Sequence, residues 1–477
     1  MVKENPVPGK SRKPLLVMKF GGTSVGNAER MKNVAEIVAE HARHAEVAVV
    51  VSAMGGVTDM LIRAATEAAQ GDREHYKNVR RELAHRHREV ADQLLAPAEQ
   101  AIVLPRLAEQ VGAFENLCAG FSMVREVTPR AMDTLSSLGE VMSASLVAAI
   151  LRSQGVPAED VDATELIVTD EHFGNATPLF EETNAKTRQR LAGLRRRGAV
   201  PVVTGFRGAT RSGLCTTLGR GGSDYSGTIV GAALDADEVW IWTDVDGVMT
   251  ADPRLVPEAR IIPEVSYREA IELSFFGAKV LHPKTIQPVM KKKIPVWIKN
   301  SFNPSCPGTK IVPAAPDGHP GVKAITSVSK ASLITVNGRD MLSFPQLAAR
   351  VFGALSLEDI PTLMVTQSSA ENVVCFAAHD ADLKRAKTRL EKAFELEMLH
   401  DRVAAIEVMH NVAIVVAIGE NMKGTPGIAG RAFGALGRRG INIIAIAQGS
   451  SELSISFAVK SPDVKEAVKA IHEEFKL

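Results

Sequence analysis

Residues 15–24 read LLVMKFGGTS, an apolar run that ends in a lysine, a phenylalanine and two glycines. The run Leu15–Phe20 has the length and composition of a buried β-strand, and the glycines predict a tight turn into a helix. Gly21 and Gly22 let the backbone approach an anion closely, and the N-terminus of the next helix offers free N–H groups. Lys19 adds a positive charge suited to a phosphoryl group. The pattern is neither GxxxxGK(S/T) nor GxGxxG, and alone it fits a structural turn as well as a phosphate site.

The chain around this stretch alternates short apolar runs with helical segments such as Ala28–His41 and Gly227–Leu234. The other runs are Val47–Ser52, Pro201–Gly205, Val239–Thr243 and Pro295–Lys299. This alternation predicts an α/β fold, with an open, largely parallel sheet sandwiched by helices. Residues 60–152 are almost purely helical and read as an excursion from the sheet domain. His85 and His87 lie there, and we expect a solvated helix face rather than a metal site.

Three further motifs carry groups suited to a small charged substrate. Ser52 to Thr58 (SAMGGVT) follows the second strand, where open α/β sheets bind their ligands. Thr217 to Tyr225 (TLGRGGSDY) offers Arg220 as a fork for a carboxylate and Asp224 as a partner for an ammonium group, which together suit a zwitterion. A helix cap with a structural salt bridge is the alternative for this pair. Trp242 to Val248 (WTDVDGV), Asp252-Pro253-Arg254 and Phe276 to Pro283 (FGAKVLHP) complete the series.

In this order and spacing, KFGGTSV, TTLGRGGSDYS, WTDVDGV, DPR and FGAKVLHP resemble the motifs of the aspartate kinase family. The resemblance covers Pro14 to Leu477. It implies an amino-acid kinase fold over residues 14–310, a linker over 311–321, and two α+β ACT domains (βαββαβ) over 322–408 and 409–477. Residues 1–13 are basic and rich in proline and are expected to form a loose leader.

The resemblance also implies the site residues. Lys19, Arg220 and Asp224 would be catalytic; the aspartate site would comprise Ser52, Thr58, Glu140, Arg220, Ser223 and Asp224. The ATP site would comprise Lys19, Phe20, Gly21, Gly22, Thr243, Asp244, Asp246, Arg254 and Lys279. Met249 stands where some relatives have a tyrosine near the nucleotide base, which leaves the packing of the base open.

The implied reaction joins two anions, so positioning and charge neutralisation must supply the catalysis. Lys19, Lys279 and a Mg²⁺ carried by ATP meet that need, and we expect no metal held by the protein itself. A side-chain carboxylate is already ionised at neutral pH, so no general base is assigned. For His282 we expect a capping or packing role.

Composition limits the other possibilities. The 56 basic and 55 acidic residues give a net charge of +1 and no field for nucleic acid or anionic lipid. No apolar run approaches the length expected of a membrane span. The four cysteines form no CxxC pair, so we expect each of them to be buried and reduced. These features favour a cytoplasmic protein.

Beyond the Pro- and Gly-rich stretch 303–320, the chain repeats itself. MLSFPQLAARVFGAL at Met341 aligns without gaps to MKGTPGIAGRAFGAL at Met422, and the same offset of 81 residues pairs Gln367 with Gln448. This indicates an internal duplication. The second copy ends on a helix and lacks a last strand, and we predict that Val322–Val328 supplies it, since an unpaired sheet flank is unfavourable.

The two copies differ where an amino acid would bind. The second has Gly424, Thr425 and Asn442 where the first has bulkier residues and a proline, and we place the effector site at Gly424, Thr425, Asn442 and Gln448. The resemblance implies feedback inhibition by threonine or lysine, with a lean towards threonine, and a homodimer or homotetramer formed through the ACT domains. A tail that only dimerises the protein is the alternative.

Two competing functions remain open. One is another kinase of the superfamily, acting on glutamate, acetylglutamate, carbamate or a nucleoside monophosphate. The other is a non-catalytic amino-acid sensor, against which the intact Lys19, Arg220, Asp224 and Lys279 argue. Since the sequence stops at Leu477 after the second repeat, a fused homoserine dehydrogenase is not expected.

Overall fold

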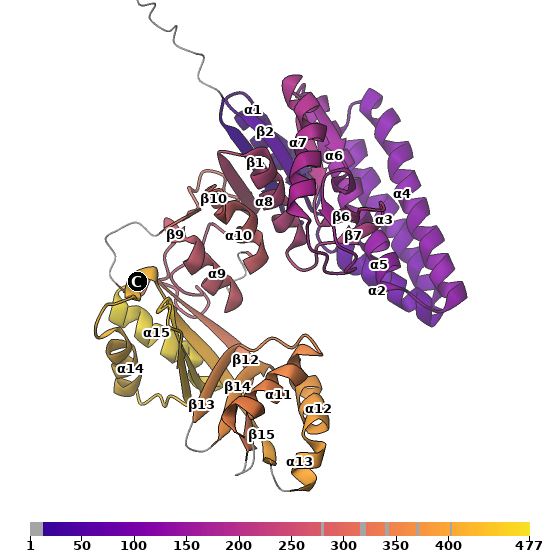
Figure 1. The fold of residues 1–477 in the computed structure, drawn as a ribbon. Helices are drawn as coiled ribbons and strands as arrows, with labels where there is room; N and C mark the ends of the chain where they lie inside the picture. The colour runs from indigo at the N-terminus through magenta and orange to yellow at the C-terminus, as the bar shows by residue number, and fades with distance from the viewer. Residues whose placement is uncertain (1–12, 278–280, 315–320, 339–342, 369–371, 401–402) are drawn as a thin grey trace, which may run out of the picture. The chain divides into compact units, whose positions relative to one another are not determined.

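The computed structural model describes residues 13–277, 281–314, 321–338, 343–368, 372–400 and 403–477. The chain divides into two units, Met1–Gly247 with Val280–Pro313 and Val248–Lys279 with Ala314–Leu477 (Figure 1). Most of the expected leader and residues 315–320 of the expected linker lie outside the described residues.

The first unit is built around a mainly parallel sheet with the order β3-β5-β2-β1-β8-β10-β11. Only β11 runs antiparallel to its neighbour within this set. The strands of the unit are β1 Leu15–Phe20, β2 Glu46–Val51, β3 Ala158–Val161, β4 Val168–Thr169, β5 Val200–Thr204, β6 Arg207–Thr210, β7 Cys215–Thr217, β8 Glu238–Thr243, β10 Val296–Asn300 and β11 Thr309–Val312. Strands β4, β6 and β7 form a separate small sheet.

Strand β1 lies between β2 and β8, and every one of its side chains is buried. A parallel strand covered on both faces needs a continuous apolar run, which explains the unbroken sequence of Leu15–Met18. Because β1, β2, β5 and β8 are parallel, their carboxyl ends meet at one edge, where open α/β sheets bind ligands.

Helices cover both faces of this sheet. Helices α1 and α6 pack on one side, and α7, α8 and α10 on the other. Their bounds are α1 Ala28–Ala42, α2 Val57–Gln70, α3 Arg73–Leu94, α4 Pro97–Val124, α5 Pro129–Ser136, α6 Leu138–Ser153, α7 Phe180–Arg196, α8 Gly222–Leu234 and α10 Pro283–Met290, with a 3-10 turn at Ala163–Glu165. Helix α8 begins five residues before the expected Gly227, so the motif containing Asp224 forms its first turn.

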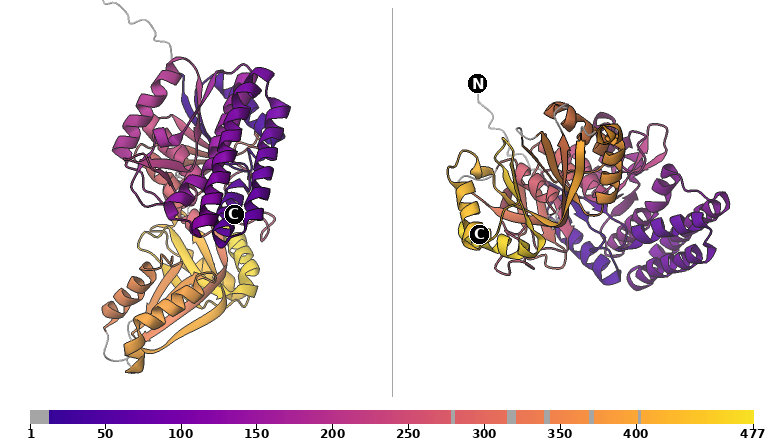
Figure 2. Two further views of the ribbon diagram at one scale, coloured as in Figure 1. Left: turned by 90° about the vertical axis from the view of Figure 1, so that its right-hand side faces the viewer. Right: turned by 90° about the horizontal axis from the view of Figure 1, so that it is seen from below.

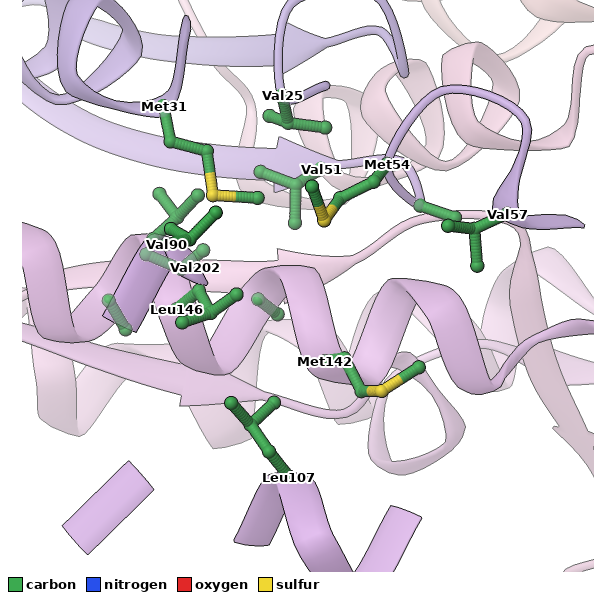
Figure 3. Packing of buried hydrophobic residues seen from close by; sticks show 14 of the residues in the cluster. Val25, Met31, Val51, Met54, Val57, Val90, Leu107, Met142, Leu146 and Val202 are labelled. Carbon is green, nitrogen blue, oxygen red and sulfur yellow. The ribbon is translucent and has the colours of Figure 1, made fainter. Parts of the chain in front are cut away.

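The helical excursion runs from α2 to α6, and its long helices α3 and α4 lie side by side (Figures 1 and 2). Figure 3 shows side chains from the sheet, Val51 and Val202, gathered with Met31, Val90 and Leu146 from three helices. The excursion is therefore anchored to the sheet domain by a shared apolar core.

Two predictions about the burial of side chains were wrong. His87 is fully buried, not on a solvated face, and its Nδ1 lies 2.8 Å from the carbonyl oxygen of Leu83. Burial lowers the pKa of His87 to about 4, so the ring is neutral. His85 is exposed as expected. All four cysteines are free, but only Cys118 is buried, and the other three are partly exposed.

The segment Pro129–Ser153 corrects the expectation about membrane spans. By length and composition alone it is long and apolar enough to cross a membrane, the single such segment among the described residues. Within the structure, 89% of its apolar window is buried, because α6 lies in the core between the sheet and α4. This is the burial of a core helix.

The second unit contains a six-stranded sheet with the order β13-β14-β12-β15-β17-β16. Its elements are β9 Glu264–Ser266, α9 Tyr267–Phe275, β12 Ala324–Gly338, α11 Phe344–Ser356, β13 Met364–Ser368, β14 Val373–His379, α12 Leu383–Ala393, α13 Glu395–Leu399, β15 Val403–Ile418, α14 Ile428–Arg438, β16 Ala445–Gln448, β17 Ser454–Lys460 and α15 Val464–Phe475, with 3-10 turns at Glu420–Met422 and Ser461–Asp463. These elements form two α+β modules that share their long central strands.

Strands β12 and β15 each serve both modules. The later part of β12 pairs with β14 and with the first half of β15, whereas Ala324–Val328 pairs antiparallel with Ile414–Ile418. The second half of β15 also pairs with β17. Residues 324–328 are thus the flanking strand of the second module, and the modules are interleaved.

A segment that carries kinase motifs belongs to this second unit. Ala251 and Val256 lie in the core of the second module with Ile325 and Phe457. The backbone N–H of Ile325 donates to the carbonyl of Thr250 at 2.8 Å. On the same side, Oγ1 of Thr250 lies 3.0 Å from Nε2 of His472. The segment that follows the WTDVDG motif is therefore built into the C-terminal unit.

Candidate active site

A cavity of about 640 Å³ opens where β1, β2 and the start of α8 meet. Its lining includes Lys19, Ser52, Thr58, Glu140, Arg220 and Asp224. Each was expected in the aspartate or catalytic site, and the fold brings them together from six separate elements or turns. Gly22 and Ser223 line the same cavity.

The cavity is centred on an ion pair between Lys19 and Asp224. Nζ of Lys19 lies 2.5 Å from Oδ1 of Asp224, and the two side chains are 8% and 19% exposed. Lys19 is the fifth residue of β1, and Asp224 lies in the first turn of α8, where the helix dipole favours a carboxylate. A side chain on Gly227 would come within 3.0 Å of Cβ of Lys19, so glycine there makes room for the lysine stem.

Arg220 lies at the mouth of the cavity and is exposed. Among the described residues its guanidinium has neither an ion pair nor a hydrogen bond. It follows Gly219 and precedes Gly221, which have φ of 75° and 72°, values that favour glycine. A side chain on Gly221 would also meet Cβ of His282 at 2.6 Å. The turn thus presents Arg220 towards a ligand.

His282 has the expected capping role. It is the N-cap of α10, and its ring accepts a hydrogen bond from the backbone N–H of Lys284. Burial lowers the pKa of His282, which favours this neutral, accepting form.

Glu140 is a buried carboxyl group in the wall of the cavity, on the first turn of α6. Its Oε2 has no hydrogen-bond partner in the described structure. Burial raises the pKa of Glu140 to about 8, an effect opposed by nearby N–H groups and by the charges of Arg207 and Lys19. This carboxyl therefore carries its proton at neutral pH in the ligand-free site.

The glycine turn after β1 is packed too tightly for a side chain at Gly22, where a Cβ would lie 2.9 Å from the carbonyl oxygen of Ala53. At Gly21 a Cβ would lie 3.5 Å from Nζ of Lys19, which is an ordinary contact. The N–H of Gly21 donates to the carbonyl of Trp242, and that of Ser52 to the carbonyl of Phe20. The turn therefore links the ends of β1, β2 and β8 beside the lysine.

Of the expected nucleotide residues, Lys19 and Gly22 line the cavity, and the others that the structure describes do not. Thr243 ends β8, Asp244 and Asp246 follow it, and Oδ1 of Asp246 accepts hydrogen bonds from Asn300 at 2.9 Å and Asn303 at 3.1 Å. Phe20 is fully buried and stacks on Trp242 with centroids 5.9 Å apart, so only its backbone faces the turn.

Arg254 lies in the second unit, is exposed and forms an ion pair with Asp252 at 2.6 Å. Lys279 lies outside the described residues. The structure therefore brings the aspartate set together and leaves the nucleotide set as a prediction.

A second cavity, of about 590 Å³, lies in the second ACT-like module. Thr425 and Gln448 line it, as expected for an effector site, and the N–H of Gly424 donates to Glu452 of its wall at 2.7 Å. Asn442 does not line it. Asn442 is exposed in the segment before β16, which begins at Ala445, so its place in the expected effector site was wrong for this cavity.

Several residues near the first cavity were not recognised from the sequence. Asp133 is buried and accepts hydrogen bonds from Thr217 and from the N–H of Gly174, and burial raises its pKa. Phe206 lines the cavity, and Arg207 lies buried beside it in the chain. Their motif, GFRG, follows a strand, which is the signal that was available.

The described residues contain no group of three or more His, Cys, Asp or Glu side chains placed to hold a metal ion. Asp244 and Asp246 are carboxylates at the end of β8, the ligand type that Mg²⁺ accepts.

Comparison with family models gives two matches. Residues 14–300 match the amino acid kinase family, and residues 334–394 and 415–475 each match an ACT domain. The second ACT match begins and ends 81 residues after the first, which is the offset of the sequence repeat.

The similar curated proteins include plant aspartokinases. The chain is 37% identical over 464 residues to bifunctional aspartokinase/homoserine dehydrogenase 1, chloroplastic, of Zea mays, covering 96% of this chain and 50% of that protein. It is 33% identical over 462 residues to aspartokinase 1, chloroplastic, of Arabidopsis thaliana, covering 96% and 80%. The chain spans about half the length of the bifunctional plant relatives that it matches.

The similar solved structures include E. coli aspartokinase III in complex with aspartate and ADP (R-state). It matches with a TM-score of 0.83 and 29% identity, covering 97% of this chain and all of that one. The complex of E. coli aspartokinase III with lysine and aspartate (T-state) matches with a TM-score of 0.78 and 30% identity, covering 97% and 99%.

Proposed function

Since the chain belongs to the aspartokinases of the amino acid kinase family, we propose that it transfers the γ-phosphoryl group of ATP to the β-carboxylate of L-aspartate. The product would be aspartyl-4-phosphate, the first step towards lysine, threonine and methionine. The observation that carries this proposal is the cavity itself. It combines the Lys19–Asp224 pair with Arg220, which has no ion pair within the described part of the chain, beside a glycine turn.

The charges of the site suit aspartate. Arg220 offers two parallel N–H groups to the α-carboxylate, and Asp224 accepts from the α-ammonium. The β-carboxylate then points towards Lys19, which neutralises charge as the phosphoryl group moves. No side chain has to remove a proton from the nucleophile, because a carboxylate is ionised at neutral pH.

The proposed contacts of the nucleotide are Thr243, Asp244, Asp246, Arg254 and Lys279. Gly21 and Gly22 would contact its phosphates. Mg²⁺ commonly binds through phosphate oxygens and one or two carboxylates, and Asp244 and Asp246 fit that role. When bound it would supply charge neutralisation on the phosphates.

We also propose feedback control at the ACT domains. The E. coli relative has been solved with lysine. In this chain the cavity lined by Thr425 and Gln448 is the candidate effector site, with threonine or lysine as the ligand. The proposal also includes a homodimer or homotetramer formed through the ACT domains, and a cytoplasmic location. Because some relatives are named chloroplastic, cell fractionation is the test of that location.

Hydroxylamine trapping tests the activity. With ATP and Mg²⁺, the chain should form a hydroxamate from L-aspartate in preference to glutamate, acetylglutamate or carbamate. A preference for another acid would assign a different kinase of the superfamily. No hydroxamate with any acid, together with amino-acid binding, would indicate a sensor.

Inhibition assays test the control. Thr425→Val and Gln448→Leu should weaken inhibition by threonine or lysine, because both side chains line the cavity. Asn442→Ala is the matched control in the same module, since Asn442 lies outside the cavity. Equal inhibition of all four proteins would remove this cavity from the proposal.

A further inference from the structure

A buried aspartate joins two segments of the cavity wall without lining the cavity. Asp133 lies on α5 and is 2% exposed. Its Oδ2 accepts hydrogen bonds from the backbone N–H groups of Gly174 and Thr217, both at 2.9 Å, and its Oδ1 accepts from Oγ1 of Thr217 at 2.8 Å. No cation pairs with Asp133 within the described residues. Its side chain therefore serves to bind two segments that lie 41 and 84 residues further along the chain.

The first of these segments leads directly into the turn that presents Arg220. Thr217 is the last residue of β7 and lies three residues before Arg220. All three of its polar groups are engaged, since its N–H and Oγ1 bind Asp133 and its carbonyl accepts from the N–H of Ala176 at 2.8 Å. The direction in which the chain enters the turn is thereby fixed.

The second segment, the loop 170–177, supports the same turn. Gly174 of this loop lines the cavity. A side chain on Gly219 would come within 2.6 Å of Oδ1 of Asn175 and 3.2 Å of the carbonyl oxygen of Gly174, so the loop packs directly against the turn. The carboxyl group of Asp133 thus holds both the strand that leads into the turn and the loop that packs on it.

The turn needs such support because of its own composition. Arg220 stands between Gly219 and Gly221, and glycine leaves a backbone free to adopt many conformations unless other groups restrain it. Since the guanidinium of Arg220 has no partner within the described part of the chain, its direction depends on how the backbone is held. Asp133 holds that backbone immediately before the turn.

We propose that Asp133 is a positioning residue for the aspartate site: its two oxygens fix the end of β7 and the loop at Gly174, and thereby aim Arg220 at the α-carboxylate of aspartate. This inference rests on the proposed function. It makes aspartate affinity depend on the hydrogen-bond acceptors at position 133 and not on their charge.

Kinetics of three variants test this dependence. Asp133→Leu has a similar shape without acceptors, and it should raise the KM for aspartate about tenfold while leaving that for ATP unchanged. Asp133→Asn should restore most of the affinity, because its Oδ1 can accept from both N–H groups and its amide can donate to Oγ1 of Thr217. Thr217→Val loses one of the three bonds and should raise the KM for aspartate about two- to threefold. An unchanged KM in Asp133→Leu, or an equal rise in Asp133→Asn, would overturn the inference.

A double-mutant cycle tests whether the effect passes through Arg220. In the background of Arg220→Ala, Asp133→Leu should cause little further rise in the KM for aspartate. Independent, multiplying effects of the two substitutions would contradict a positioning role.

Thr183→Val is the matched control for a loss of stability alone. Thr183 is fully buried, and its Oγ1 binds both backbone groups of Val168 on β4, in the same small sheet as β7. Its replacement should lower the urea midpoint, as Asp133→Leu does, and leave the KM for aspartate unchanged. An equal rise in KM in Thr183→Val would mean that Asp133 only supports the fold.

The outcomes separate the two proposals. If the wild type forms no hydroxamate from aspartate, the proposed function fails, and hydrogen exchange then decides whether Asp133 holds the turn. Peptides that cover residues 170–177 and 217–222 should exchange about tenfold faster in Asp133→Leu than in Asp133→Asn, and equal exchange would refute that hold. If the wild type is active but the KM for aspartate does not follow the predicted order, only the role of Asp133 fails. Should Asp133→Leu not fold, Thr217→Val and its cycle with Arg220→Ala decide the question.

Discussion

Replacing Glu269 tests most directly how the segment that follows the WTDVDG motif is held in the C-terminal unit. Glu269 is 1% exposed on α9, and its Oε2 lies 2.8 Å from Nζ of Lys323, the residue before β12. The same oxygen accepts from the N–H of Ser266, and Oε1 accepts from the N–H of Glu420 at 2.8 Å. One buried carboxylate thus joins three segments that are distant in sequence.

Glu269→Gln should destabilise this unit strongly. Glutamine keeps an acceptor but removes the charge, which leaves the partly buried ammonium of Lys323 without its charged partner. Breaking a buried ion pair from one side costs about 3–5 kcal/mol. Because 1.4 kcal/mol is a factor of ten, amide exchange in β12, β15 and β17 should accelerate by about 10²–10⁴-fold.

The two units can be observed separately. The three tryptophans, Trp240, Trp242 and Trp297, all belong to the first unit, so their fluorescence during urea unfolding reports on that unit. Hydrogen exchange resolved by peptide reports on the second. We expect faster exchange in the second unit, with the tryptophan transition shifted by less than about 0.5 kcal/mol.

Glu272→Gln, on the same helix, is the matched control and should change neither signal appreciably. Lys323→Met should resemble Glu269→Gln, and the double variant should cost less than the sum of the two. Unchanged exchange in Glu269→Gln, or an equal loss in the tryptophan transition, would refute this account of the segment.

Three other expectations follow from the site and the core. Arg220→Ala should raise the KM for aspartate about 10- to 100-fold and leave that for ATP unchanged, since an exposed charged contact is worth about 1.5–3 kcal/mol; an unaltered KM for aspartate excludes Arg220 from the site. Lys19→Met should lower kcat about 10²–10³-fold with little change in KM, and near-normal turnover would contradict its role. His87 has a pKa of about 4 when folded and an ordinary value of 6.5 when unfolded, so the unfolded state takes up the proton first. Stability should therefore fall by about 3 kcal/mol between pH 6.5 and 4, and urea unfolding of His87→Gln should lack that slope.

The sequence was most informative where local patterns carry the structure. The apolar run before Lys19 predicted the central strand to the residue, because a strand covered on both faces needs unbroken apolar side chains. The repeat predicted two ACT modules, and the family matches fall at the same offset. For Lys19, Ser52, Arg220 and Asp224, strand ends and glycine turns marked the segments that line the cavity, whereas Glu140 on α6 was named only through the family resemblance.

The remaining features depend on contacts between distant residues. Glu269 and Glu420 are 151 residues apart, and nothing near either one marks the bond that joins them. The raised pKa of Glu140 comes from burial, which no local motif reports. Arg207 was not recognised because a single arginine after a strand is ordinary, and its burial depends on the packing of segments distant in sequence. His87 was misassigned because its charged neighbours suggested a solvated face.

Transfer of an oxygen isotope tests the central claim of aspartate phosphorylation most directly. Aspartate labelled with ¹⁸O in its 4-carboxylate is incubated with ATP, Mg²⁺ and hydroxylamine, and the phosphate released is examined by ³¹P NMR. The carboxylate oxygen becomes the bridging atom of the acyl phosphate and leaves with the phosphate when hydroxylamine attacks the carbonyl carbon. One ¹⁸O atom in each phosphate is the predicted result. Unlabelled phosphate, or label that appears only when the 1-carboxylate carries it, would contradict the account.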